Sequence, residues 1–232
     1  MKMRSLTVFF SLLFFVTSSW GKDKCETQLH VICPDPGDLF YNFPENADQL
    51  STRCSEQIVY LECLTDYQEN CGTNFPESDF LPAVLKTLNK FCNKGTVLFN
   101  AVADNGKCVG KFYKTITEDR LNKCLQKIED ENREKYEEIV YFSNDLKDEE
   151  REYCFLDIMQ TSCLADAISV DCGKTAKELF LHILQDIGMN NLVCENHQDD
   201  AKNFTKELSL NLKPENSMED FIALLENETE FV

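Results

Sequence analysis

Apolar residues recur every three or four positions in two segments that lie about a hundred residues apart. This spacing predicts two amphipathic helices. The first opens at Ser78 and Asp79 and tolerates Pro82 in its first turn. The second opens with a capping box of Thr175 and Glu178 and ends at Gly188. The apolar positions are Phe80, Leu81, Val84, Leu85, Leu88 and Phe91 in one helix and Leu179, Phe180, Ile183, Leu184 and Ile187 in the other.

A further helix is predicted before each of these, at about residues 48–65 and 148–167. Two consecutive helices with a short connection pack as an antiparallel hairpin. The sequence therefore predicts two helical hairpins, one in each half of the chain.

The cysteines indicate that these hairpins are copies of one unit. Cys54, Cys63, Cys71 and Cys92 have 8, 7 and 20 residues between them, and Cys154, Cys163, Cys172 and Cys194 have 8, 8 and 21. Residues at the same place relative to these cysteines also agree: Ile58 with Ile158, Leu64 with Leu164, and Gly72 with Gly173. Self-similarity of this kind is typical of an internal repeat.

The segment between the copies predicts a long charged helix. Thr115 and Glu118 form a capping box, and residues 118–141 are rich in Glu, Lys, Arg and Leu at helical spacing. The simplest interpretation of the charges is a solvated face. Just before it, Asn105 and Gly106 fit either the turn of a β-hairpin between residues 97–102 and 107–112 or the end of a helix that starts at Thr96. We favour the helix.

Both ends of the chain differ from the middle. Lys2 and Arg4 precede an apolar run over residues 6–16, which is too short to cross a bilayer and is typical of an export signal cleaved after Gly21. Prolines and Gly37 make the following residues irregular. Near the other end, Ser217 and Asp220 predict a cap for a short helix carrying Phe221, Leu224 and Leu225.

Together these patterns predict an all-α protein of disulfide-cross-linked helical hairpin repeats joined by a long charged helix. The expected organisation is a signal peptide at 1–21, an irregular lead at 22–47, a disulfide-linked helical domain at 48–200 with repeats at about 48–95 and 148–196, and a polar tail with a short C-terminal helix at 201–232.

Net charge narrows the classes of partner. The chain carries a formal charge of −18, and losing Lys2 and Arg4 with the signal makes it −20. Nucleic acid is not an expected partner, because phosphate binding needs a basic surface. After the signal, no apolar stretch has the length of a membrane span.

Twelve cysteines in a chain bound for an oxidising compartment predict six disulfides and no free thiol. A zinc site is the weaker alternative, because there is no Cys-x2-Cys pair and the histidines are few. Antiparallel hairpins predict the pairs Cys54–Cys92 and Cys154–Cys194 at one end of each hairpin and Cys63–Cys71 and Cys163–Cys172 at the other. The pairing of four cysteines stays open: Cys25, Cys33, Cys108 and Cys124.

No motif predicts catalysis, a metal site or a cofactor. His30, His182 and His197 are the histidines available to a Ser-His or Cys-His arrangement, and none lies in a recognisable motif. Secreted phospholipases would need a glycine-rich calcium loop and a His-Asp pair, which are absent from the sequence. Carboxylate-based glycoside hydrolysis has no distinguishing pattern among 41 acidic residues. A secreted hydrolase is therefore the weakest hypothesis.

Two further features concern the surface and a possible ligand. Asn203 and Asn227 begin N-glycosylation sequons, and we expect a glycan on Asn203. The hairpins could enclose an apolar groove for a small ligand such as a lipid, but for these residues we favour core filling, which is usual for amphipathic helices. The groove candidates are Phe80, Leu85, Leu88, Phe180, Ile183 and Leu184.

The run Cys154-x8-Cys163-Leu164, followed by Ile168, Cys172-Gly173 and a helix ending at Cys194, resembles a known family. It is a secreted cysteine-rich domain of unknown function, number nineteen, which is expanded in nematodes and found in arthropods. The segment from Cys92 through Phe99 and Cys108 to Cys124 resembles its middle part. The resemblance implies an extracellular helical module and no activity.

This chain departs from that family where a Phe-Gly is usual, with Gln160 and Thr161 there instead, and its mature part has no Trp. The runner-up is the insect haemolymph glycoprotein of twenty-seven kilodaltons, which is similar at Cys92, Cys108, Cys124-Leu125 and Cys154 in order. Insect odorant-binding proteins share a Cys-x8-Cys spacing but need a Cys-x3-Cys pair that is absent here.

The function expected from the sequence is that of a secreted, non-catalytic binding or interaction protein. Its partner would be an extracellular protein or a small apolar ligand, the second possibility making it a hydrophobic-ligand carrier.

Overall fold

The computed structural model describes residues 25–37, 43–72, 80–134, 147–188, 194, 202–203, 205–206, 210 and 212–229. The regular elements in these ranges are all helices, so the prediction of an all-α fold is confirmed. The helices are α2 (Leu29–Ile32), α3 (Ala47–Cys71), α4 (Phe80–Phe91), α5 (Val97–Thr115), α6 (Glu118–Glu131), α8 (Lys147–Cys172), α9 (Lys174–Asp186) and α12 (Met218–Thr229). The predicted signal peptide lies outside the described residues.

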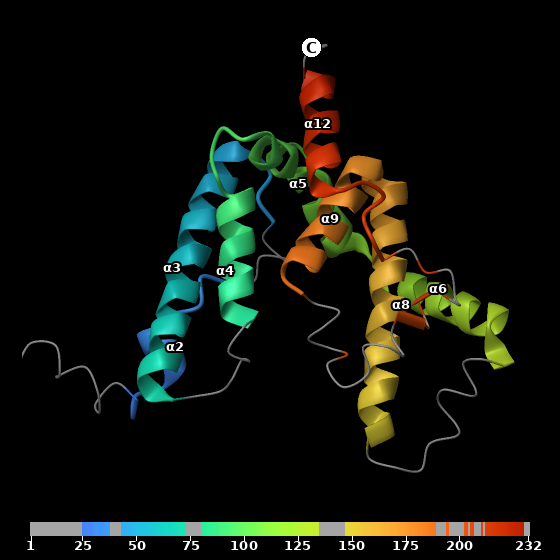
Figure 1. Cartoon of the computed structure of the whole chain (residues 1–232), viewed down its shortest axis with the longest axis horizontal. Helices are drawn as coiled ribbons and strands as arrows, with labels where there is room; N and C mark the ends of the chain where they lie inside the picture. Colours follow the sequence, from blue (N-terminus) through green and yellow to red (C-terminus); the bar gives the residue numbers. More distant parts are fainter. Residues whose placement is uncertain are drawn as a thin grey trace, which may run out of the picture.

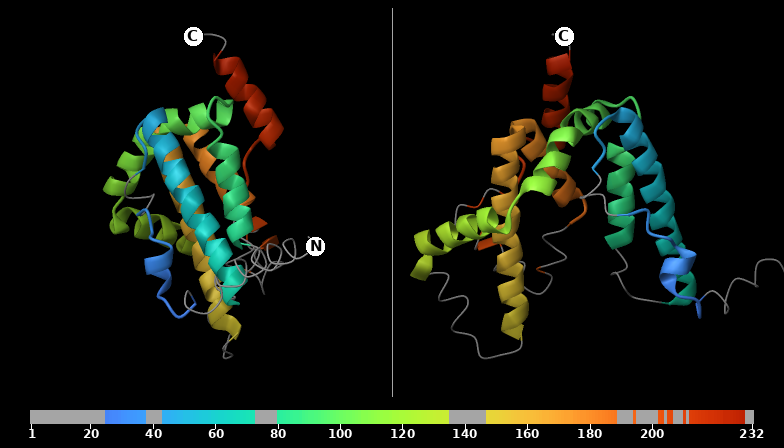
Figure 2. Two further views of the ribbon diagram at one scale, coloured as in Figure 1. Left: turned by 90° about the vertical axis from the view of Figure 1, so that its left-hand side faces the viewer. Right: turned by 180° about the vertical axis from the view of Figure 1, so that it is seen from behind.

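Two helix pairs stand on opposite sides of the molecule, and α5 joins them (Figure 1). The pair α3–α4 forms one side and α8–α9 the other, while α5 runs across the top and contacts all four of these helices. Figure 2 shows from behind that α6 extends outward from α8. The molecule therefore has the outline of an arch.

Each of the long helices α3 and α8 is followed directly by a glycine with a positive φ angle. Asn46 caps the start of α3 by accepting a hydrogen bond from the Gln49 backbone N–H, and Gly72 ends it with φ 64°. Gly173, with φ 89°, separates α8 from α9. The predicted ends at residues 65 and 167 are wrong, because no residue that breaks a helix intervenes before these glycines.

The helix starts expected after Thr115 and Thr175 are also corrected. Thr117 caps α6 instead, and Thr115 is still inside α5. Gly173 precedes α9, so Thr175 lies within its first turn and its side chain is not the cap. Of the predicted charged helix, α6 covers residues 118–131, and residues 135–141 lie outside the described ranges.

Six disulfides connect all twelve cysteines. The pairs Cys54–Cys92 and Cys154–Cys194 are those that the antiparallel geometry predicts. The predicted pairs Cys63–Cys71 and Cys163–Cys172 are wrong. The remaining bridges are Cys25–Cys71, Cys33–Cys63, Cys108–Cys172 and Cys124–Cys163.

The reason for this correction is helix length. Cys63 and Cys71 lie on the same helix, α3, and eight residues of α-helix separate their Cα atoms by roughly 12 Å. A disulfide needs Cα atoms within about 7 Å. The same argument excludes Cys163–Cys172 on α8. In each long helix, the first cysteine instead forms a disulfide with a cysteine later in the chain. The second and third cysteines form disulfides with cysteines earlier in the chain.

Asn105 and Gly106 do not mark a turn or a helix end, because α5 continues through them to Thr115. A Cβ atom added at Gly106 would collide with the Pro44 backbone oxygen, and one at Gly110 would lie 3.0 Å from the Phe43 Cβ. These glycines therefore allow the segment before α3 to approach the helix closely.

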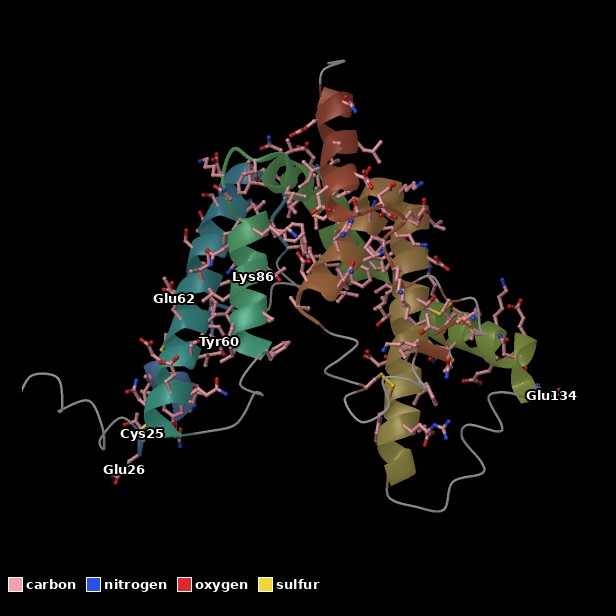
Figure 3. All side chains as sticks on the ribbon, viewed as in Figure 1. Cys25, Glu26, Tyr60, Glu62, Lys86 and Glu134 are labelled. Carbon is pink, nitrogen blue, oxygen red and sulfur yellow. A yellow bond between two sulfur atoms is a disulfide. The ribbon has the colours of Figure 1, made fainter. Side chains whose placement is uncertain are left out.

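The predicted lead and tail both belong to the folded body in part. The lead contains α2 and is bonded to α3 through Cys25 and Cys33; Figure 3 shows Cys25 at the lower end of α3. In the tail, the Ser217 hydroxyl accepts from the Asp220 backbone N–H, as predicted, and α12 packs on α5. None of the helices in the described part is long and apolar enough to cross a membrane.

Candidate functional site

An apolar cavity of about 240 Å³ is lined by residues of both helix pairs and of α5. Side chains of α4, α5 and α9 gather in this region (Figure 3). The apolar and aromatic lining includes Phe43, Leu50, Leu88, Phe91, Val102, Val109, Tyr113, Ile168, Leu179, Phe180, Ile183, Leu184 and Ile187. Because these residues come from both halves of the chain, the cavity is formed by the tertiary fold.

The structure brings together four of the six predicted groove residues. Leu88 on α4 and Phe180, Ile183 and Leu184 on α9 all line the cavity. Phe80 and Leu85, which lie on α4, are absent from its lining. The apolar groove, which the sequence offered as the alternative to core filling, thus has these four residues in its lining.

The sequence interpretation missed the wall that α5 contributes. Val102, Val109 and Tyr113 lie seven and four residues apart, which places them on one face of a helix. That signal was lost because the helix was expected to end near Gly106. Phe43 and Pro44, from the predicted irregular lead, close the cavity near the same helix.

The polar side chains at the cavity already have partners inside the protein. Arg53 donates to the Pro36 backbone oxygen and to the Glu56 carboxylate, each at 3.0 Å. Gln57 donates to the Gly37 oxygen at 3.3 Å, and Asn105 donates to the Ala101 oxygen at 2.8 Å. The donor groups of these side chains therefore stabilise the residues around the cavity.

Burial raises the pKa of Tyr113 to about 12, so this phenol is neutral at physiological pH. Arg53 is the charged residue in the lining, and Glu56 forms its ion pair. An ionised ligand would therefore lose its hydration on entering the cavity and would find no unpaired opposite charge in the lining, which makes its binding unfavourable. The chemistry of the lining fits an uncharged molecule.

The candidate histidines do not converge on one site. His30 is exposed on α2, His182 is buried on α9, and His197 lies outside the described residues. Within the described ranges there is no group of three or more His, Cys, Asp or Glu residues placed to hold a metal ion. The cavity, rather than any cluster of titratable groups, is the candidate site.

Both predicted glycosylation asparagines are exposed, Asn203 in a short described stretch and Asn227 near the end of α12. Their position leaves each side chain open to modification, and glycosylation of either stays a prediction.

No protein-family model, curated protein or solved structure matches the chain. The resemblances to the nematode and arthropod domain and to the insect haemolymph glycoprotein thus stay predictions. The case for a function rests on the cavity and its surroundings.

Proposed function

We propose that this protein is a secreted, non-catalytic carrier that holds a small, uncharged, apolar molecule in the apolar cavity. The single observation that carries the proposal is the cavity itself, with its almost wholly apolar lining. Binding of a macromolecular partner to the acidic surface is compatible with this role, but no docking site among the described residues supports it.

The exposure of the lining argues against simple core filling. Most of the lining side chains are only partly buried, so the cavity of about 240 Å³ leaves apolar surface in contact with water, at an unfavourable free energy of roughly 25 cal/mol per Å². Leu88, Phe180, Ile183 and Leu184 are also half-buried, which is unusual for residues whose role is to fill a core. A ligand would cover their remaining apolar surface and recover this free energy.

The volume also limits the ligand. Pockets for drug-sized molecules have volumes of about 300–1,000 Å³, so this cavity suits a smaller one. An alkyl chain or a compact ring system bearing a neutral polar group fits both the size and the lack of an unpaired charge.

The order of the disulfides supports a repeating unit that is longer than the helical hairpin. Numbering the cysteines of each half from one to six gives the pairs one–five, two–four and three–six in both halves. We propose that the chain is two copies of this six-cysteine unit, with α5 and α6 standing in the second copy where the lead and α2 stand in the first. Secretion through the predicted signal would supply the oxidising environment that six bridges need.

The test is binding of the neutral fluorophore N-phenylnaphthylamine to the purified full-length mature protein. Leu88→Trp and Leu184→Trp, on opposite walls, would fill the cavity and should weaken binding at least about tenfold. Leu224→Trp is the matched control, because Leu224 is 49% exposed on α12. Circular dichroism would check that each variant is folded.

Competition would then test the ligand's charge. Dodecanol should displace the fluorophore, whereas dodecanoate and dodecyltrimethylammonium should displace it at least about tenfold less well, because the cavity does not compensate either charge. Absence of fluorophore binding, or equal binding by the two cavity variants and the control, would refute the carrier function. Hydrolysis of an ester, peptide or glycoside by the protein would refute its non-catalytic character.

A further inference from the structure

The helix α12 covers the outer side of the cavity wall. Its residues Phe221 and Leu225, 3% and 7% exposed, pack in one cluster with Phe91 and Leu179. Phe91 and Leu179 also line the cavity. These side chains therefore face α12 on one side and the candidate ligand on the other. Figure 1 shows α12 standing above the junction of α5 and α9.

His182 lies beneath this helix. It sits on α9 with 3% of its surface exposed, and its ring stacks on the Phe221 ring with centroids 5.1 Å apart and planes inclined by 30°. Its Nε2 atom is buried and has no hydrogen-bond partner among the residues that the structure describes. A buried imidazole in this setting is stable only in its neutral form, and burial lowers the pKa of His182.

The charged groups around His182 come from three helices. Glu178 and Asp186 on α9 and Glu219 on α12 favour the protonated ring, and Lys90 on α4 opposes it. Two of the carboxylates are already engaged. Glu178 accepts two contacts from the Glu215 backbone N–H, at 3.0 and 3.1 Å, and Asp186 forms an ion pair with Lys90 at 2.7 Å. At Glu178 and Asp186, a protonated His182 would thus compete with bonds that already exist.

We propose that His182 is a pH-sensitive latch, which holds α12 against the cavity wall when neutral and releases it when protonated. Release of α12 would expose the outer side of Phe91 and Leu179 to water and loosen the cavity. The loss of ligand on acidification rests on the proposed carrier function, whereas the release of α12 does not.

The direction follows from linkage. Because the pKa of His182 is lower with α12 docked than in an exposed histidine, the released state binds more protons as the pH falls through about 6.5. Docking is therefore fully favoured above that pH and weakens below it. Uptake of one proton lowers the docking constant by at most about tenfold between pH 7.5 and pH 5.5.

Hydrogen exchange of residues 218–229, followed by mass spectrometry on the full-length mature protein, measures docking directly. After correction for intrinsic rates, protection of α12 should fall from pH 7.5 to pH 5.5, by at most about tenfold. His182→Phe, which retains a ring to stack on Phe221, should abolish this fall. His182→Gln, which is neutral and polar, provides a second variant that cannot titrate. His30→Gln, at the exposed histidine of α2, should leave the fall unchanged.

Equal pH dependence in the wild type and in both His182 variants would overturn the proposal, as would constant protection of α12 in the wild type. The same variants, tested for N-phenylnaphthylamine binding, separate the latch from the carrier function. A pH-dependent α12 in a protein that never binds the fluorophore would support the latch and refute the carrier. Fluorophore binding without a pH-dependent change in the protection of α12 would support the carrier and refute the latch.

Discussion

The two halves of the molecule share their disulfide order but differ in how they are packed. On α3, the buried residues are Leu50, Cys54 and Leu61. On α8, a helix of nearly the same length, they include Cys154, Phe155, Ile158, Met159, Cys163, Ala165 and Ile168. The first half is a disulfide-linked helix pair with few buried residues, whereas the second has a larger core.

The difference follows from the number of neighbours. The helix α8 packs against α5, α6 and α9, while α3 packs against α4 and α5. In the second half, the segment that carries the first two cysteines is formed by α5 and α6, which bring apolar faces to α8. In the first half, the equivalent segment carries α2, and none of its four residues is buried. Identical cross-links can therefore serve halves with very different apolar burial.

The largest effect should come from removing apolar bulk at equivalent positions. Ile158 is 2% exposed in the core of α8, whereas Ile58, its counterpart on α3, is half-buried. Ile158→Ala should lower the free energy of unfolding by about 2–5 kcal/mol. Ile58→Ala should cost about 1 kcal/mol or less, because water already reaches the side chain. Denaturant titration of both variants gives the comparison, and equal losses would contradict the difference in packing.

A comparable but more local effect is expected from removing equivalent bridges, Cys25–Cys71 and Cys108–Cys172. The loops that they close span 46 and 64 residues, so chain entropy alone separates them by only about 0.3 kcal/mol. Replacing both cysteines of Cys108–Cys172 by Ala should cost about 2–5 kcal/mol, with α5 still docked through Phe112 and Ile168. The same change at Cys25–Cys71 should cost less, because the lead gains freedom in the folded state as well.

Hydrogen exchange would distinguish these two outcomes by region. In the Cys25→Ala/Cys71→Ala variant, residues 25–32 should exchange like an unstructured chain while α3 remains protected. In the Cys108→Ala/Cys172→Ala variant, α5 should keep most of its protection. Detachment of α5, or a lead that stays protected without its bridge, would show that the two halves are not stabilised as described.

Local sequence signals predicted many of the helices. The errors arose where contacts between distant segments determine how a residue is used. Periodic apolar residues identified α4, α9 and α12, and the cap at Ser217 was correct because it depends on four consecutive residues. The expected end of α5 near Gly106 was wrong because Gly106 serves close approach to Pro44, a contact between distant segments. Sequence pattern alone cannot separate a glycine that ends a helix from one that admits a neighbour.

The same distinction applies to the site. Half-buried apolar residues on α4 and α9 were predictable from their helical spacing, and four of them line the cavity. Their arrangement around a cavity depends on α5 crossing between the two pairs, which no local pattern encodes. The stacking of His182 on Phe221 was equally unpredictable, because α12 lies some forty residues further along the chain.

The smallest expected effect concerns the last turns of α3 and α8, where Asn70 and Asp171 are equivalent. Arg120 on α6 donates to both oxygens of Asp171, at 2.6 and 3.1 Å, whereas Asn70 bonds within its own helix to the Asp66 oxygen. The hydrogen bonds from Arg120, followed by the charges of Arg120 and Lys111, lower the pKa of Asp171. Because the pair is exposed, its contribution to stability is small.

Asp171→Asn should therefore lower the melting temperature slightly at neutral pH and have no effect in strong acid. The sign follows from the lowered pKa: the contribution of Asp171 is fully present above the ordinary value of about 3.9 and disappears as the pH falls through the lower folded value. Asn70→Asp is the matched change in the other half, where no arginine forms an equivalent pair among the described residues, and it should give no gain. Melting curves followed by circular dichroism at neutral pH and in strong acid test both variants. A loss for Asp171→Asn that persists in strong acid would mean that its effect is not electrostatic, and stabilisation by Asn70→Asp would show that the asymmetry between the two helix ends has another cause.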